Sequence, residues 1–210
     1  MDKNENERLI VFCDAVIAIT ITLLVLELSL PDGAERMSDA ALWQALADLR
    51  PRLTGYVISF LVIALFWLGH RQKFSWIVRS SGLLIWLNLG FLLGISWMPF
   101  ATDMLIENGG RLATALYAGL TMMIALLAAA MAWHAVRAGL ADESHRDLSP
   151  LWLAGPSLAT ALVFALSIPI AFWSPEAAQH SWLLLLPLSL IASRRIDADL
   201  ARASAARPRE

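Results

Sequence analysis

The sequence predicts an all-α fold, specifically a polytopic membrane protein with six transmembrane helices. Hydrophobic residues make up 58% of the 210-residue chain, whereas charged residues make up only 16%. The apolar residues gather in runs of about twenty, the length at which a helix crosses a bilayer core. A soluble domain of this size would need a larger charged surface. We therefore expect one six-helix transmembrane domain over residues 1–210, with a polar cytoplasmic tail at 196–210.

Polar or helix-breaking residues mark the ends of the predicted spans. The Pro-Asp-Gly segment 31–33 follows the first span, the polar segment 70–73 ends the second, and Pro99 lies near the end of the third. Pro187 interrupts the sixth span. The six predicted spans are about 9–30, 53–72, 82–101, 112–137, 150–173 and 178–193.

Residues 38–49 and most of the tryptophans are predicted to lie at the membrane surface. Leu42, Trp43, Leu46 and Leu49 recur at helical spacing among polar residues, which predicts a short amphipathic helix on the membrane. Tryptophan favours the membrane–water interface because its ring is apolar and its indole N–H is polar, so each one is expected to be an interfacial anchor or a helix-packing residue. The tryptophans close to predicted span ends are Trp43, Trp76, Trp97, Trp133, Trp152, Trp173 and Trp182.

Charge in the short loops predicts the orientation of the six spans. If six spans are counted, the loops on one side collect lysine and arginine, which marks the cytoplasmic side of a membrane. The opposite loops collect acidic residues instead. We therefore expect both termini in the cytoplasm and the protein in the cell inner (plasma) membrane. The basic residues are Lys3, Arg8, Arg71, Lys73, Arg79, Arg194, Arg195, Arg202, Arg207 and Arg209.

One face of the first span is a stripe of large aliphatic residues. At about 100° per residue, with Ile19 at zero, Leu23 and Leu26 fall within about 40° and Thr22 lies near −60°. Considered without any relative, this stripe has two readings, ordinary helix packing or a pore surface. We expect the span to stay in the protein, because it is too long for a signal peptide and contains Asp14.

Asp14 lies away from the aliphatic stripe, near −140° on the same projection. A carboxylate inside a membrane is costly unless it is paired with another group. We expect Asp14 to face other helices of its own subunit, in a buried anchoring network with Arg8, His70, Arg71 or Asn88. The alternative for this carboxylate is a direct role in permeation or proton sensing.

The first three spans carry a specific set of residues in order. Arg8-x3-Phe12-Cys13-Asp14-Ala15 opens the first span, with Ile19 and Thr22 behind it. Phe66-Trp67-x2-His70-Arg71-x2-Phe74 ends the second span, and Asn88-Leu89-x-Phe91-Leu92 and Ser96-x2-Pro99-Phe100 lie in the third. This pattern resembles the signature of the transmembrane protein 175 family, the bacterial and lysosomal potassium channels. The second half of the chain matches that family only as three hydrophobic spans.

The resemblance implies a homotetramer of six-helix subunits, with the first helix of each subunit lining a central pore. Ile19, Leu23 and Leu26 correspond to the aliphatic rings that constrict the pore in the family, and Thr22 corresponds to the hydroxyl layer beside them. Four copies of such rings are expected to gate by excluding water. Because the sequence contains no Thr-Val-Gly-Tyr-Gly loop, selectivity for potassium over sodium is expected to be modest.

The resemblance also implies a structural polar network at the cytoplasmic end. Arg8 and Asp14 correspond to the charged pair of the signature, which in the family joins the His of the second span, here His70, and the Asn of the third, here Asn88. The chain departs from the family at Cys13, where the usual residue is Ser. Ala18 likewise stands where some members have Ser. Both departures remove a hydroxyl from this end of the helix.

The expected function is a potassium-permeable cation channel, whose partners are copies of itself, the lipid bilayer and potassium ions. We expect no cofactor and no metal site, because Cys13 is the single cysteine and has no neighbouring ligands of the C-x-x-C kind. A net charge of −2 gives no reason to expect nucleic-acid binding. The sequence also lacks the nucleophile and zinc-protease motifs that would predict an enzyme.

A secondary transporter or an orphan membrane scaffold is the alternative to a channel. Transporters commonly show inverted repeats and broken helices. The two halves of this sequence do not resemble each other, although Pro156, Pro169 and Pro187 could break helices. Flux that follows the ion gradient without a coupled ion would favour the channel over the transporter.

Overall fold

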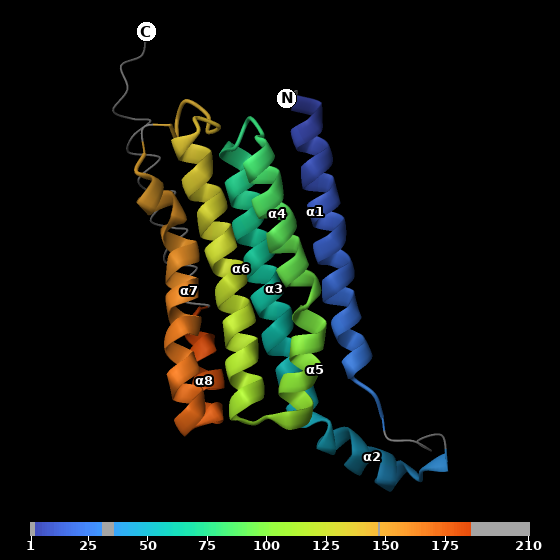
Figure 1. Ribbon diagram of the computed structural model, residues 1–210. Coiled ribbons are helices and arrows are strands. Elements are labelled where there is room, and N and C mark those ends of the chain that lie inside the picture. The colour runs from blue at the N-terminus through green and yellow to red at the C-terminus, as the bar shows by residue number, and fades with distance from the viewer. Residues whose placement is uncertain (1–2, 31–35, 147, 186–210) are drawn as a thin grey trace.

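The computed structural model describes residues 3–30, 36–146 and 148–185, and these residues form a bundle of long helices that run up and down beside one another (Figure 1). Where the structure describes the chain, it contains no β-strand longer than a single bridge between Ile77 and Ala141. The helices are α1 (Lys3–Leu23), the 3₁₀ helix η1 (Leu24–Glu27), α2 (Asp39–Asp48), α3 (Arg50–Trp76), α4 (Gly82–Ser96), α5 (Met98–Asn108), α6 (Arg111–Arg137), α7 (Pro150–Trp173), α8 (Pro175–Ser181) and the 3₁₀ helix η3 (Trp182–Leu184).

Five spans in the described part of the chain are long and apolar enough to cross a membrane. They correspond to the first five spans predicted from the sequence, so the all-helical membrane fold is confirmed for that part. The predicted sixth span begins within α8 and η3, and its second half at 186–193 lies outside the described residues, as does the predicted tail at 196–210. The five observed spans are Asn6–Glu27, Arg50–Trp76, Gly82–Asn108, Arg111–Arg137 and Pro150–Trp173.

The helical segments of the second and third spans continue past the predicted span ends. The third span continues past residue 101 to Asn108, because Pro99 lies in the first turn of α5, where its missing N–H costs no hydrogen bond. The chain bends at Trp97 between α4 and α5 and then resumes its helix. The second span continues through the polar segment 70–73 to Trp76, because His70 and Lys73 are buried inside the bundle.

The prolines of α7 leave that helix unbroken. Pro156 and Pro169 both lie inside the single helix Pro150–Trp173. A helix in a membrane tolerates proline when its neighbours or local side chains satisfy the freed backbone groups. Pro156 and Pro169 leave the carbonyls of Trp152 and Ala165, four residues earlier, without their helical N–H donors.

The core of the bundle lies around α6. Half of the most apolar stretch of α6 is buried by the rest of the chain, against 22% for α1. The buried face of α6 is rich in alanine, and such small side chains let helix backbones approach closely in a membrane. α1 is therefore the most peripheral span, and Figure 1 shows it at the edge of the bundle. The buried alanines of α6 are Ala113, Ala118, Ala125, Ala128, Ala129, Ala132 and Ala135.

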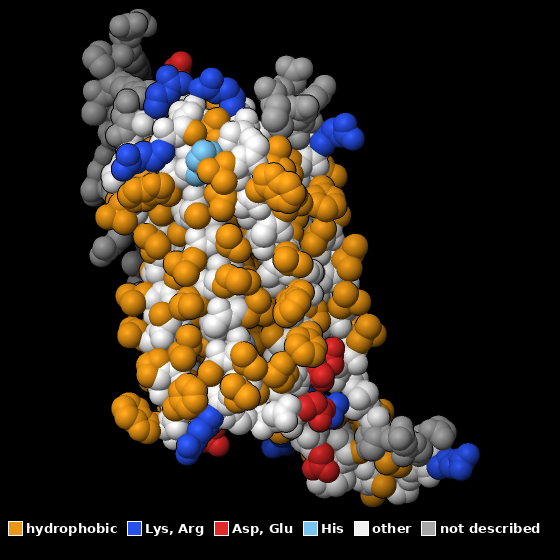
Figure 2. Space-filling view, in the orientation of Figure 1, with side chains coloured by type: hydrophobic (Ala, Val, Ile, Leu, Met, Phe, Trp, Pro, Cys, Tyr) orange, Lys and Arg blue, Asp and Glu red, His pale blue; other side chains and the backbone are white. Residues whose placement is uncertain are grey.

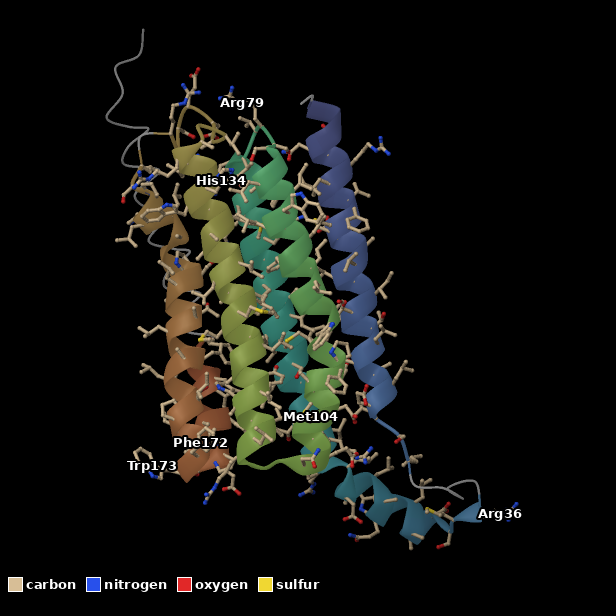
Figure 3. All side chains as sticks on the ribbon, viewed as in Figure 1. Arg36, Arg79, Met104, His134, Phe172 and Trp173 are labelled. Carbon is tan, nitrogen blue, oxygen red and sulfur yellow. The ribbon has the colours of Figure 1, made fainter. Side chains whose placement is uncertain are left out.

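The end of the bundle where α1 begins is closed by contacts between loops. Asn6 Nδ2 donates to the Ile77 carbonyl at 2.9 Å, which ties α1 to the α3–α4 connection. The Asp142 amide donates to the Trp76 carbonyl at 2.9 Å, which ties that connection to the α6–α7 loop. Figure 3 shows Arg79 and His134 at this end, and Figure 2 shows Lys and Arg side chains gathered there.

The predicted amphipathic helix at 38–49 is confirmed as α2, Asp39–Asp48. Ser38 caps it by accepting a hydrogen bond from the Ala41 amide at 3.4 Å. α2 extends sideways from the end of the bundle opposite the start of α1 (Figure 1), and none of its residues is buried. Trp43 is 75% exposed. Its position on the membrane surface stays a prediction.

Candidate pore-lining face of the first helix

α1 presents one face to the bundle and the opposite face to its surroundings. Cys13, Ile17 and Leu24 are fully or almost fully buried, and they lie roughly between 120° and 160° when Ile19 is set at zero. The contacts of this buried face are with α3, α4 and α5. The helix therefore turns its opposite side, centred near Ile19, away from the rest of the chain.

The predicted aliphatic stripe lies on this uncovered side. Ile19 is 59% exposed, Leu23 42% and Leu26 70%. The helix changes to 3₁₀ geometry at Leu24, and in a 3₁₀ helix residues three apart lie in line. The tighter winding therefore brings Leu26 closer to the line of Leu23 than a continued α-helix would. The described residues leave the stripe without a partner surface.

Thr22 is exposed beside the stripe, and its hydroxyl is held by its own helix. The Thr22 Oγ1 donates to the Ile19 carbonyl at 2.7 Å. Because the hydroxyl hydrogen points to the backbone carbonyl, the oxygen lone pairs point away from the backbone. They can accept a hydrogen bond from water or contact a cation. The arrangement suits a hydroxyl layer next to an apolar ring.

The far end of α1 is tied to the start of α3 and surrounded by carboxylates. Arg52 forms an ion pair with Glu107 of α5 and donates to the Glu27 carbonyl at 3.4 Å. Glu27 and Asp103 also lie close enough to interact. Three carboxylates and one guanidinium leave a negative balance at this end, which Figure 2 shows as a group of acidic side chains near α2.

Two of the four predicted network residues meet in the interior. His70 of α3 and Asn88 of α4 are buried and share a hydrogen bond of 2.9 Å between Nε2 and Oδ1. The Asn88 Nδ2 in turn donates to the sulfur of Cys13 at 3.0 Å. The α1 member of this chain of hydrogen bonds is therefore Cys13, the residue that departs from the family Ser.

Arg8 and Asp14 lie outside that chain of hydrogen bonds. Asp14 is exposed and accepts a hydrogen bond of 2.9 Å from the indole of Trp67. Arg8 is also exposed, and within the described residues no hydrogen bond joins it to Asp14, His70 or Asn88. Neighbours on a helix point about 100° apart, so when Cys13 faces the core, Asp14 falls at the edge of the contact with α3.

Asn6 and Trp67 are members of the α1 anchorage that the sequence pattern did not assign. Trp67 belongs to the quoted family pattern, so the resemblance contained the signal for its contact with Asp14. Asn6 lies before the apolar run, and nothing in its sequence context indicates that it bonds to the Ile77 carbonyl. Over the described residues, no group of three His, Cys, Asp or Glu side chains is arranged to hold a metal ion.

Comparison with known proteins identifies the family. The family model of the endosomal/lysosomal potassium channel TMEM175 matches residues 8–99, which include α1 and the anchoring residues of α3 and α4. A potassium channel of Streptomyces collinus is 38% identical over 143 residues, covering 65% of this chain and 67% of that protein. A potassium channel of Chamaesiphon minutus is 31% identical over 182 residues, covering 82% of this chain and 88% of that protein.

A solved structure agrees with the sequence matches. The crystal structure of a lysosomal potassium-selective channel TMEM175 homolog from Chamaesiphon minutus superimposes with a TM-score of 0.78 and 25% identity, covering 90% of this chain and 98% of that chain. The fold and the order of the helices are thus similar over nearly the whole of both chains. This chain belongs to the TMEM175 family of ion channels.

Proposed function

We propose that the protein is a potassium-permeable channel in which four copies bring the exposed stripe of α1 around a shared axis. The observation that carries this proposal is the orientation of α1, which buries Cys13, Ile17 and Leu24 and leaves Ile19 and Leu26 more than half exposed. The relatives that cover most of the chain are named potassium channels, which supports the same function.

The stripe would act as the gate. Ile19, Leu23 and Leu26 from four subunits would form stacked apolar rings, and a narrow apolar ring excludes water and therefore blocks ions. A modest widening would rewet the ring and let potassium pass. Selectivity over sodium would be modest, because the helix offers Thr22 hydroxyls but no ring of backbone carbonyls to replace the hydration shell of the ion.

The charged residues at the two ends of the bundle support an orientation in which α1 begins on the cytoplasmic side. Lysine and arginine gather at that end, as expected of the cytoplasmic face. At the other end, Glu27, Asp103 and Glu107 would raise the local concentration of cations at the mouth of the pore. Six spans per subunit, both termini inside and a location in the plasma membrane belong to this proposal.

Replacing Ile19 by Asn tests the gate. A polar ring holds water, so purified Ile19→Asn protein in liposomes should conduct more potassium current than the parent. Leu162→Asn on α7 is the matched control, because Leu162 has the same 59% exposure and lies on a helix away from α1. An unchanged current in Ile19→Asn, or an equal increase in Leu162→Asn, would count against an α1 constriction.

Reversal potentials under opposed potassium and sodium gradients test the permeant ion. A potential displaced modestly toward the potassium value is expected. Flux that saturates and requires a coupled proton or sodium gradient would instead indicate the secondary transporter, and absence of any flux would indicate a scaffold.

A further inference from the structure

The anchorage of α1 contains a buried histidine with one ring nitrogen unused. His70 is 2% exposed and lies between the rings of Phe74 and Phe91, with ring centroids 4.4 Å and 5.4 Å away. Its Nε2 is bonded to Asn88, whereas its Nδ1 has no hydrogen-bond partner among the described residues. Buried polar atoms without a partner are rare and require an explanation.

The chain of hydrogen bonds assigns the proton on the ring. Asn88 uses its Nδ2 to donate to the Cys13 sulfur, so its Oδ1 faces His70 as an acceptor. The His70 Nε2 must therefore carry the hydrogen, and Nδ1 is the bare nitrogen of a neutral imidazole. In a neutral ring, Nδ1 has only a lone pair without a partner. An unpaired lone pair at this buried atom costs less free energy than an unpaired N–H would.

A second proton on His70 does not suit this packing. It would bind to Nδ1 and create a buried N–H without an acceptor, and the attraction of the stacked phenylalanine rings for a cation does not supply that acceptor. The charged and titratable groups around the ring are Lys73 and Arg71 on α3, and Asp14 and Cys13 on α1.

None of these groups offers the new N–H an acceptor, and the Cys13 sulfur already accepts from Asn88. Lys73 donates its amine to the Gly69 carbonyl at 3.2 Å, and Asp14 accepts from Trp67 at the exposed side. Arg71 lies over the Trp67 ring at 5.9 Å. α4 contributes Asn88 and Phe91, which carry no charge.

We propose that His70 Nδ1 is a proton-binding site that releases α1 when it is occupied. The Cys13–Asn88–His70 chain of hydrogen bonds, which we term the inner latch, holds α1 to α3 and α4 while the ring is neutral. Proton binding requires the ring to leave its pocket for water or for an acceptor, and Asn88 and Cys13 then lose their partners. Acidification of the cytoplasmic side thereby detaches the inner half of α1, the half nearest the start of the helix.

The size of the effect follows from proton linkage. Imidazole in water titrates near pH 6.5. If only the released state binds the proton, the ratio of released to latched protein rises by at most about a hundredfold between pH 7.5 and pH 4.5. The consequence for conduction rests on the proposed function, because α1 must line the pore for its release to alter flux.

Cys13 provides a direct probe of the inner latch. It is the single cysteine of the sequence and is fully buried, so a thiol reagent reaches it only when α1 separates from the bundle. The full-length protein would be labelled in detergent or liposomes at pH 7.5 and pH 4.5 with 4,4′-dithiodipyridine. Rates would be divided by the rate for N-acetylcysteine at the same pH, which removes the titration of the thiol itself.

The parent should show a normalised labelling rate at least about tenfold higher at pH 4.5. His70→Gln, which can still donate to Asn88 but does not titrate, should change by less than about twofold. His134→Gln is the matched control, because His134 also lies at this end but bonds to Ser81 on the α3–α4 connection. It should retain the full acid response.

Equal acid responses in the parent and His70→Gln would overturn the proposal. A parent whose Cys13 stays protected at pH 4.5 would overturn it as well. If His70→Gln labels rapidly at both values of pH, the histidine is only a packing element and the proposal is wrong. Labelling does not depend on conduction, so a protein that carries no potassium flux would end the proposed function without deciding the outcome for the inner latch.

Discussion

Gly94 of α4 lies tightly against Ile124 of α6, and replacing it by Ala should destabilise the bundle. A Cβ atom at this position would lie 2.6 Å from Ile124 Cγ1 and 3.4 Å from Ile124 Cδ1. Carbon atoms pack best at about 3.5–4.0 Å, so one contact is short by about 1 Å. Ile124 is fully buried and β-branched, which leaves its side chain little room to turn away.

The expected cost can be worked from these contacts. Overpacking of a well-filled core costs about 1–3 kcal/mol, and the gain in helix propensity from Gly to Ala returns up to about 1 kcal/mol. We therefore expect Gly94→Ala to lower the free energy of unfolding by about 1–2 kcal/mol. Denaturant titration of the purified protein in detergent, followed by tryptophan fluorescence, would measure this difference.

Gly90, one turn earlier on α4, is the matched control. A Cβ atom there would lie 3.7 Å from the two methyl carbons of Leu127, which is an ordinary contact. Gly90→Ala should therefore be neutral or slightly stabilising. In an Ile124→Ala background, which lacks both contacting carbons, Gly94→Ala should cost less stability than it does in the parent. If Gly94→Ala is as stable as Gly90→Ala, the close approach of α4 and α6 is not as the structure describes it.

Two further predictions concern polar groups. Tyr117→Phe removes the partner of the Ser59 hydroxyl, 3.0 Å away, and should cost about 0.5–1.5 kcal/mol in the same titration, because Thr102 still donates to Ser59 at 2.7 Å. In the α6–α7 loop, burial raises the pKa of Asp142, but hydrogen bonds from His145 and Ser144 outweigh it and set the pKa below its ordinary value. Asp142 therefore adds stability above the ordinary carboxyl range near pH 3.9, and this contribution is lost as the pH falls through the lowered pKa. Asp142→Asn should melt at a lower temperature than the parent at pH 7, and the difference should shrink at pH 3. A difference that grows toward pH 3 would contradict the sign of this shift.

One face of α1 carries the residues that anchor the helix to the bundle, and the opposite face carries the uncovered aliphatic stripe. Polar contacts from Asn6, Cys13 and Asp14 hold the inner half of α1 to the bundle. The outer half is held by the buried Ile17 and Leu24 and by the contacts of Arg52. A helix fixed in this way can present its other side to a neighbouring molecule without losing its place in its own chain.

The sequence alone was sufficient to predict the first five membrane-spanning helices. A helix satisfies its own backbone hydrogen bonds, so a long apolar run in a membrane has no other stable conformation than a helix. The amphipathic helix α2 followed from local periodicity in the same way. Proline is a weaker signal, because its effect depends on its place in the helix. Pro99 opens α5, and Pro156 and Pro169 lie inside α7.

Only the tertiary structure decided which side of α1 faces the bundle and which residues anchor it. Periodicity placed Ile19, Leu23 and Leu26 on one stripe, but a helix with apolar residues on most sides has no preferred inner face until its neighbours are known. Cys13 lacks the hydroxyl of the family Ser, and its sulfur accepts the hydrogen bond from Asn88. That contact joins residues 75 positions apart in the sequence, and such distant pairs depend on how α1, α3 and α4 pack together.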